Sequence, residues 1–428
     1  MSMLKSSMLN GIAVSVKVVS ALVLNKLLSI YVGPAGYAIV GQFQNVVAII
    51  VSLAGGVLST GVTKATAQHY DDESKQQSVW HTAIKFSLIA SLVTGFSLLF
   101  IGDLLSEWLL HRSDMTSVFI CLSLTLPAMA ANNLLLAIVN GKKEIRVYVI
   151  ANIIGSIFSM VVTGFLAYEF GLLGVLIAFT INPAVTLLAS VGLVYRMEWF
   201  NTQALWGTVD RDAARELAGF GFMAVTSALM APLMHMLVRE HLAMSLGMAA
   251  AGYWQAIWKI SEIYLMLITS TLAVYYLPRI AEIRTARELK SEIGKVYRFL
   301  LPLTVFSSIV IFLLRDFIIF TLFTKEFVPM RELFFWQLIG DVIKMCSWIL
   351  GYVLIGRSMV KFFVVKEIVV SLLFVFLTIL FVGKLGLQGV AVAYALTYSV
   401  NFVLLFFIVR YEMREMDNQL TLKAGLNE

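Results

Sequence analysis

Charged residues are scarce in this chain. Only 14% of its 428 residues are Asp, Glu, Lys or Arg, whereas 60% are hydrophobic and the mean hydropathy is +0.87. Soluble domains carry about 25% charged residues. The composition therefore predicts a membrane protein with many spans, and it leaves no polar block that could form a separate soluble domain.

Cysteine is almost absent as well. The two cysteines, Cys121 and Cys346, lie in apolar segments, which excludes a disulfide framework and predicts neither a metal site nor a cofactor. No G-x-x-x-x-G-K-[ST] motif occurs, so we do not expect direct use of ATP. The outer loops predicted below have about 5–14 residues, too few for the catalytic loop of a membrane glycan polymerase or acyltransferase. No catalytic residue is predicted, and the sequence favours a transporter over an enzyme or a non-transporting scaffold.

Twelve apolar segments follow one another along the chain. Only helices and closed barrels satisfy their backbone in lipid, and these runs are too long and too continuously apolar for barrel strands, so an all-α fold is predicted. The segments are residues 11–32, 38–63, 82–102, 116–139, 147–168, 174–195, 219–238, 252–277, 299–320, 333–355, 362–382 and 390–409.

The loop charges predict the orientation. With the N-terminus in the cytoplasm, the inner segments carry 20 Lys and Arg residues and the outer segments carry 6. Lys and Arg concentrate on the cytoplasmic side of membrane proteins. Both termini are therefore predicted to be cytoplasmic, and the net charge of +6 is first a topology signal rather than a sign of nucleic-acid binding.

Short glycine motifs repeat at a constant offset. Gly36-Tyr37 matches Gly252-Tyr253 at an offset of 216, and Gly141-Lys142 matches Gly356-Arg357 at an offset of 215. The stretch at 171–175 matches that at 386–390, again 215 residues later. The sequence thus predicts two parallel six-helix repeats, an architecture of transporters whose substrate site lies between the repeats. The predicted parts are lobes at 1–195 and 219–410, a cytoplasmic linker at 196–218 and a cytoplasmic tail at 411–428.

Six charged residues lie well inside the predicted spans. They are Lys17, Lys26, Lys259, Lys344, Glu262 and Asp341. An ionised group at the centre of a membrane helix costs about 2.5–3.5 kcal/mol, so these side chains are expected to face protein or a water-filled cavity. Lys259–Glu262 and Asp341–Lys344 are spaced i, i+3, where the partners share one helix face and can neutralise each other.

Two of the four cations have no internal partner by this count. The excess predicts a cationic cavity for an anionic head group, with Lys17, Lys26 and Lys259 as substrate-binding residues. Glu262 and Asp341, together with Lys344, are the predicted sites for a coupling proton or sodium ion. Two alternatives stay open: the lysines of the first span can snorkel to head groups, and each i, i+3 pair can be structural.

Five stretches, spread over both halves, carry a family resemblance. They are Asn25–Tyr37, Gly61–Lys64, Asn133–Ala137, Leu313–Phe317 and Phe327–Lys344. Through them the chain resembles the Wzx-type lipid-linked oligosaccharide flippases of the multidrug/oligosaccharidyl-lipid/polysaccharide (MOP) exporter superfamily. The similarity is greatest to the members that serve O-antigen and enterobacterial common antigen.

The resemblance implies a fold, a substrate and partners. The fold is V-shaped, with two six-helix lobes around a central cavity in the bacterial inner membrane. The substrate is undecaprenyl pyrophosphate bearing one oligosaccharide repeat unit, moved to the outer leaflet by alternating access. A glycan polymerase and a chain-length regulator are implied partners, besides membrane lipid and the coupling H⁺ or Na⁺.

Three residues match family positions in the cavity-lining spans, namely Lys26, Lys64 and Glu262. One departure weakens a role of the second span: residues 41–44 read G-Q-F-Q, with glutamine where a close family member has arginine. The alternative function is a cation-coupled multidrug exporter of the same superfamily, which would require a more acidic cavity.

Overall fold

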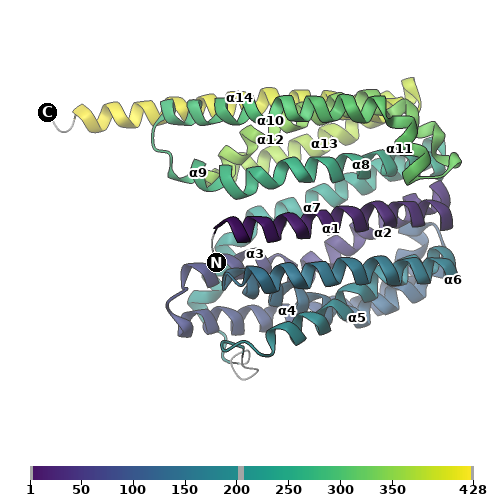
Figure 1. The fold of residues 1–428 in the computed structure, drawn as a ribbon, viewed down its shortest axis with the longest axis horizontal. Coiled ribbons are helices and arrows are strands. Elements are labelled where there is room, and N and C mark those ends of the chain that lie inside the picture. The colour runs from purple at the N-terminus through teal and green to yellow at the C-terminus, as the bar shows by residue number, and fades with distance from the viewer. Residues whose placement is uncertain (1–2, 201–206, 426–428) are drawn as a thin grey trace. The chain divides into compact units, whose positions relative to one another are not determined.

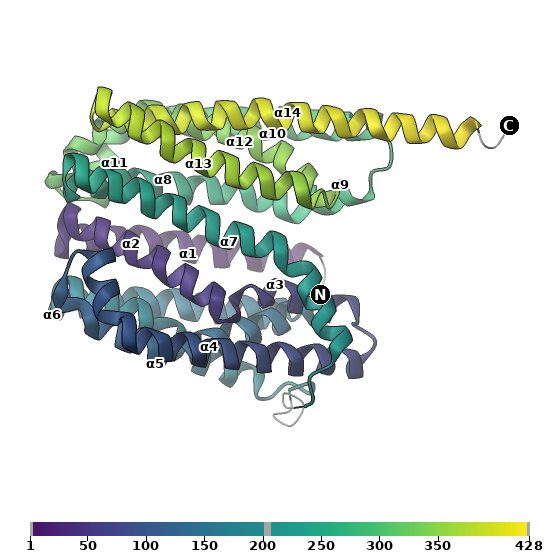
Figure 2. The same ribbon diagram turned by 180° about the vertical axis from the view of Figure 1, so that it is seen from behind.

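The computed structural model describes residues 3–200 and 207–425, and the regular structure in these ranges is helical (Figures 1 and 2). The predicted all-α fold is thereby confirmed. The chain divides into two compact units, residues 1–235 and 236–428. The predicted lobes, linker and tail stay a prediction; residues 201–206 of the linker and 426–428 of the tail lie outside the described residues.

The first unit is built around α5. This helix packs against α4 and α6, and α1 packs against α6. The elements are α1 (Met3–Tyr31), α2 (Gly33–Val51), the π-helical turn η1 (Ser52–Gly56), α3 (Leu58–Gln68), α4 (Glu73–Leu110), η2 (Ser113–Met115), α5 (Thr116–Gly141), α6 (Ile145–Val194) and the first part of α7 (Arg211–Leu246).

The second unit is built around α12. This helix packs against α14, α10, α9 and α8, and several of its side chains, such as Met345, Ile349 and Val353, are fully buried. The elements after α7 are α8 (Met248–Thr271), η4 (Leu272–Tyr276), α9 (Leu277–Glu282), α10 (Ala286–Leu313), α11 (Arg315–Leu322), η5 (Lys325–Leu333), α12 (Phe334–Gly356), α13 (Val360–Leu385) and α14 (Gln388–Gly425).

Nine helical stretches among the described residues are long and apolar enough to cross a membrane. One of them, α6, has 50 residues and would extend about 75 Å if it were straight, against about 30 Å of hydrocarbon. It bends at Gly171, whose φ of 54° and ψ of −132° are not helical. The two predicted segments 147–168 and 174–195 therefore lie on either side of this break.

The backbone repeats at the predicted offset. Gly386 has a φ of 59° and a ψ of −139°, nearly the values of Gly171. Lys143 and Ser358, also 215 residues apart, both have positive φ, 59° and 55°. These conformations are unfavourable for most residues, so their recurrence is strong support for a duplicated unit.

Local signals account for several helix starts. The side chain of Asp72 caps α4 by accepting a hydrogen bond from the backbone N–H of Lys75 at 3.1 Å. That bond, with the nearby Lys75 ammonium, lowers the pKa of Asp72 below its usual range. Thr285 caps α10 by accepting from the backbone N–H of Glu288. Pro34 stands in the first turn of α2, where its missing N–H is not needed.

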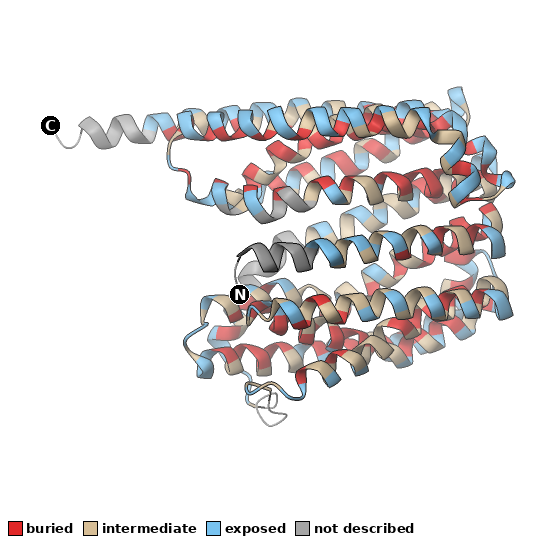
Figure 3. Cartoon of the chain, in the orientation of Figure 1, coloured by how far each residue is buried: buried red, intermediate tan, exposed pale blue. Residues whose placement is uncertain are grey.

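Exposed residues occur along the helices (Figure 3), and many of them are large and apolar. On α4 they include Phe96, Phe100 and Trp108, each at least 65% exposed. A water-soluble protein rarely exposes so much apolar surface, whereas lipid is a suitable solvent for it. The chain is a multi-pass membrane protein.

Candidate functional site

The structure places the predicted site residues in four helices. In the first unit, Lys17 and Lys26 lie on α1 and Lys64 lies on α3; Lys26 is half-buried, and the other two are exposed. In the second unit, α8 carries Lys259 and Glu262, and α12 carries the buried pair Asp341 and Lys344. The predicted residues thus fall into one cationic set and one mixed set, described in turn.

Asp341 is the centre of a buried hydrogen-bond network. Its side chain is fully buried in α12. Its Oδ2 accepts hydrogen bonds from the hydroxyls of Ser261 at 2.6 Å and Tyr264 at 2.8 Å, both on α8. Its Oδ1 accepts from the hydroxyl of Tyr394 on α14 at 2.7 Å. The carboxyl group therefore joins three helices, and buried polar groups need such partners.

Lys344 lies one turn beyond Asp341 in a cage of aromatic rings. Its ammonium is 4.6–5.6 Å from four ring centroids, well placed for cation–π attraction. The rings belong to Trp258, Trp348, Tyr394 and Tyr398.

Asp341 and Lys344 share one helix face, as predicted, and their opposite charges attract each other, but other groups make the direct contacts of both side chains. The short aspartate side chain stays near its own helix, where hydroxyls from α8 and α14 reach it. The four-carbon stem of Lys344 carries its ammonium onward to the rings. Both groups are therefore stabilised by other partners, and the carboxylate and the ammonium form no ion pair within the described network.

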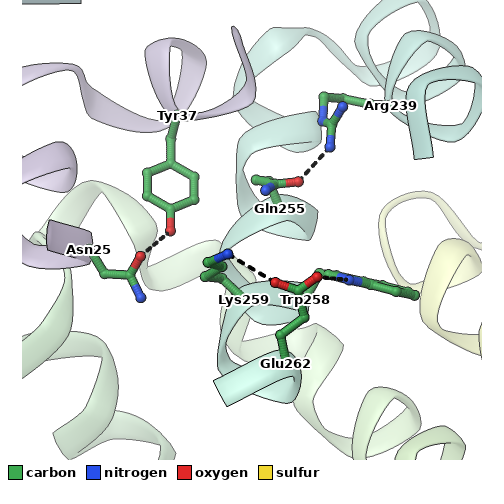
Figure 4. Close-up of polar contacts among 7 residues, drawn as sticks. All are labelled: Asn25, Tyr37, Arg239, Gln255, Trp258, Lys259 and Glu262. Atoms are coloured by element: carbon green, nitrogen blue, oxygen red, sulfur yellow. Dashed lines mark hydrogen bonds and ion pairs between the residues drawn. The ribbon is translucent and has the colours of Figure 1, made fainter. Parts of the chain in front are cut away.

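The second predicted pair does form. Lys259 Nζ lies 2.9 Å from Glu262 Oε2, and both side chains are partly exposed (Figure 4). The indole N–H of Trp258 donates to the other oxygen, Oε1, at 3.2 Å. Because Trp258 also lies over the ammonium of Lys344, one side chain contacts both the exposed pair and the buried cage.

Arg239 is a functional candidate that the sequence reasoning missed. The predicted orientation placed it in an outer loop, but it lies in α7 and the residue is only 2% exposed. Its guanidinium donates to Gln255 Oε1 at 2.6 Å and lies over the ring of Trp254 (Figure 4). Leu242, three positions on and on the same helix face, is fully buried as well, but nothing in the local sequence indicated the burial of either residue.

The first unit supplies a region without negative charge. Residues 1–70 contain no Asp or Glu, whereas Lys5, Lys17, Lys26 and Lys64 lie in this stretch. Next to Lys26, the buried amide oxygen of Asn25 accepts a hydrogen bond from the hydroxyl of Tyr37 at 2.8 Å (Figure 4). This bond ties α1 to α2 and so orients the helix that carries the two intramembrane lysines.

Chemically, these groups are suited to binding and orienting charged ligands. The described residues contain no group of three or more His, Cys, Asp or Glu side chains that could hold a metal ion. The first unit offers ammonium groups to an anion. The second unit offers a buried carboxyl, a caged ammonium and a partly exposed ion pair, groups that suit the binding of a small ion.

Comparison with known proteins finds relatives that align with most of the chain. It is 29% identical over 405 residues to the lipid III flippase of Escherichia coli (strain K12), covering 94% of this chain and 97% of the flippase. The lipid III flippase of Shigella flexneri matches to the same extent. These relatives confirm the resemblance to the flippases of the MOP superfamily and the interpretation of the chain as a transporter rather than an enzyme.

Solved structures share the fold. An inward-facing multidrug resistance MATE family transporter of the MOP superfamily superposes with a TM-score of 0.80 at 16% identity, covering 95% of both chains. A MOP superfamily transporter from Pyrococcus furiosus superposes with a TM-score of 0.69 at 16% identity, covering 95% of this chain and 96% of the other. At this identity the likeness shows the fold alone.

A family model provides the assignment. The model described as polysaccharide biosynthesis protein matches residues 33–332, which is 300 of the 428 residues. The match includes α2 through η5 and so extends over parts of both compact units. On this match, the chain belongs to the polysaccharide biosynthesis protein family and has the fold of the MOP-superfamily transporters.

Proposed function

We propose that this protein is a flippase for lipid-linked oligosaccharides. The substrate is an undecaprenyl-pyrophosphate-linked repeat unit of O-antigen or a related glycan, moved from the cytoplasmic to the periplasmic leaflet. The likeness to the lipid III flippases over 94% of the chain supports the substrate class. The observation that carries the proposal is the acid-free stretch of residues 1–70 with its intramembrane lysines, because a pyrophosphate needs cationic partners in a medium of low dielectric.

Several finer features belong to the same proposal. The protein works by alternating access of its two lobes (1–195 and 219–410) in the bacterial inner membrane, with both termini in the cytoplasm. The pyrophosphate is bound by Lys26 with Lys17, Lys64 and Lys259, while the oligosaccharide crosses in a wet cavity and the polyprenyl chain stays in lipid. A glycan polymerase and a chain-length regulator receive the product.

Replacing Lys26 by alanine is expected to lower flipping at least about tenfold, because one charge-assisted hydrogen bond contributes about 1.5–3 kcal/mol. Translocation of a fluorescent pyrophosphate-linked polyprenyl oligosaccharide is measured in proteoliposomes. The matched control is Lys384→Ala, which removes an exposed lysine at the end of α13. No translocation by the folded wild type would refute the function, whereas equal rates in wild type and Lys26→Ala would remove Lys26 from the site.

Transport is coupled to a proton or sodium ion through the second unit. Glu262 is the accessible carboxylate, and Trp258 connects it to the cage of Lys344, one turn from the buried Asp341. When a proton or sodium ion binds Glu262, it would replace Lys259 as the partner of this carboxylate. The change would reach Lys344 and Asp341 through Trp258. Glu262, Asp341 and Lys344 are therefore the proposed coupling residues.

The coupling proposal predicts a defined loss in Glu262→Gln. An imposed proton or sodium gradient should accelerate wild-type flipping, and the neutral variant should keep only the rate seen without a gradient. Glu282→Gln is the matched control, since Glu282 forms an i, i+3 pair with Arg279 that is also partly exposed. If wild-type flipping ignores both gradients, the protein is a facilitator and the coupling proposal fails.

The alternative function, a cation-coupled multidrug exporter, has the fold likeness to the MATE transporter in its favour. A cationic drug would be repelled by the acid-free stretch of residues 1–70. We therefore place this function second. The same proteoliposomes test it: export of a cationic dye without flipping of the oligosaccharide lipid would reverse the order.

A further inference from the structure

Two stretches of the second unit have no role in the proposed flippase mechanism, L-L-R-D-F at 313–317 and F-V-P-M-R-E at 327–332. Together they build an open hollow of about 590 Å³ where α10, α11, η5 and α12 meet. Ligand sites usually have volumes of about 300–1,000 Å³. The hollow is lined by both charged and aromatic side chains, among them Arg315, Arg331, Glu332, Phe312 and Phe335.

Arg315 is the side chain that points to a ligand. Its guanidinium stacks over the ring of Phe312, 4.2 Å from the ring centroid. Its Nε is buried and donates to no acceptor within the described part of the chain. A guanidinium has five N–H donors in a planar fork that suits phosphate oxygens. Because this Nε is buried, the donors that a ligand in the hollow could reach are the other N–H groups of the guanidinium, and a bound group that supplies oxygens would accept from them.

The other charges of the hollow are not equivalent. Arg331 already holds Asp316, with its Nε 3.0 Å from Oδ1. Glu332, in contrast, accepts only a long hydrogen bond of 3.5 Å from Gln388 within the described residues. One cation, Arg315, and one carboxylate, Glu332, therefore remain for a ligand. A ligand that matches both groups carries a negative charge for Arg315 and a positive charge for Glu332, so it is a zwitterion and not an anion.

Exposed apolar side chains line the hollow and lie next to Arg315 in the sequence. Phe335 and Val328 line it and are 52% and 40% exposed, and Leu313 and Phe317, two residues on either side of Arg315 in the chain, are 74% and 65% exposed. Charged groups next to exposed aromatic and aliphatic side chains are typical of the border between hydrocarbon and head groups. A ligand seated here would place its polar group on the arginine and its chains over these residues. This arrangement fits a lipid better than a soluble ion.

We propose that this hollow binds the head group of a zwitterionic phospholipid with a primary amine, its phosphate on Arg315 and its ammonium on Glu332. The primary amine matters because it has N–H donors for the carboxylate, whereas a quaternary amine has none. The bound lipid is not transported. The site is separate from the flippase function and does not depend on it.

The test uses the full-length protein in detergent, from which lipid has been removed. Retention of phosphatidylethanolamine, phosphatidylcholine and phosphatidylglycerol is compared by native mass spectrometry, and inorganic phosphate is added separately as a thermal-stability probe. We expect the ethanolamine lipid to be retained about tenfold more tightly than the other two. Equal retention of the three lipids, or stabilisation by inorganic phosphate as large as that by the ethanolamine lipid, would overturn the proposal.

Two variants separate the contacts. Arg315→Gln should bind the ethanolamine lipid about tenfold more weakly than the wild type does. The isosteric variant Glu332→Gln should bind the ethanolamine lipid no better than the choline lipid. Arg112→Gln is the control, because Arg112 is a partly exposed arginine whose guanidinium is held by two hydrogen bonds to Asp114. If Glu332→Gln keeps the full preference for ethanolamine, the amine contact is absent and the proposal fails, even if Arg315→Gln does not fold.

Discussion

Replacing Asp341 by alanine is expected to lower the free energy of unfolding by about 3–5 kcal/mol, the range seen when one member of a buried charged set is removed. The variant would leave three hydroxyls, those of Ser261, Tyr264 and Tyr394, without their acceptor. It would also leave the buried ammonium of Lys344 without the carboxyl group that lies one turn away. Unfolding in mixed detergent micelles measures the loss, and flipping should fall with it.

A graded series separates the causes of that loss. Asp341→Asn keeps one acceptor oxygen and is expected to lose only about 1–2 kcal/mol, since some of the hydroxyl bonds survive. Adding Lys344→Met to Asp341→Ala should recover stability, because the unpaired ammonium is then gone and the thioether fits an aromatic cage. The network is not stabilising if Asp341→Ala unfolds like the wild type. A double variant less stable than Asp341→Ala would show that the ammonium contributes through its rings alone.

Much of the fold could be predicted from the sequence, because lipid imposes simple rules. Continuous apolar runs must be helices, and most of the predicted segments correspond to helices of the structure. The repeat was visible at its glycines since positions such as Gly171 and Gly386 adopt conformations that few other residues tolerate. The bend at Gly171 separates two predicted segments that otherwise form one helix, α6.

The candidate site was predictable only where partners lie on one helix. The spacing of Lys259 and Glu262 predicted their ion pair, which the structure confirms. The hydroxyls that bind Asp341 come from α8 and α14, up to 80 residues away in the sequence. The spacing of residues along one helix cannot predict these contacts. In the aromatic cage of Lys344, helical spacing could indicate only Trp348, four residues on in α12, because the other rings belong to α8 and α14.

Arg239 shows how charge misleads in a membrane sequence. Arg239 stands beside a glutamate near the end of an apolar run. Because inserting charged side chains into the membrane costs free energy, such a pair is expected in a loop. Here α7 continues through it to Leu246, and Gln255 with Trp254 from α8 supplies the contacts that make burial tolerable. A charged residue can therefore lie inside a helix when residues distant in sequence supply its contacts. The hydropathy of the segment contains no information about such contacts.

Replacing Gly55 by alanine is expected to destabilise the first unit by about 2–5 kcal/mol. Gly55 lies in the π-helical turn η1 with a φ of 100°, and a left-handed conformation costs a residue with a Cβ about 1–2 kcal/mol. The added Cβ would also come within 2.6 Å of Ser87 Oγ and 2.8 Å of Ser87 Cα. Overpacking of that kind adds about 1–3 kcal/mol. Because the hydroxyl of Ser87 donates to Ala54 at 3.1 Å, the contact between η1 and α4 would be lost with it.

Thermal unfolding in detergent measures this loss, and Gly192→Ala is the matched control. Gly192 lies in α6, and its added Cβ would meet no atom within 4 Å. That substitution should leave stability unchanged or raise it by up to about 1 kcal/mol, as alanine does in a helix. An unchanged melting temperature in Gly55→Ala would mean that η1 can relax into regular helix. In that case, the packing of α4 against η1 does not maintain the irregular turn between α2 and α3.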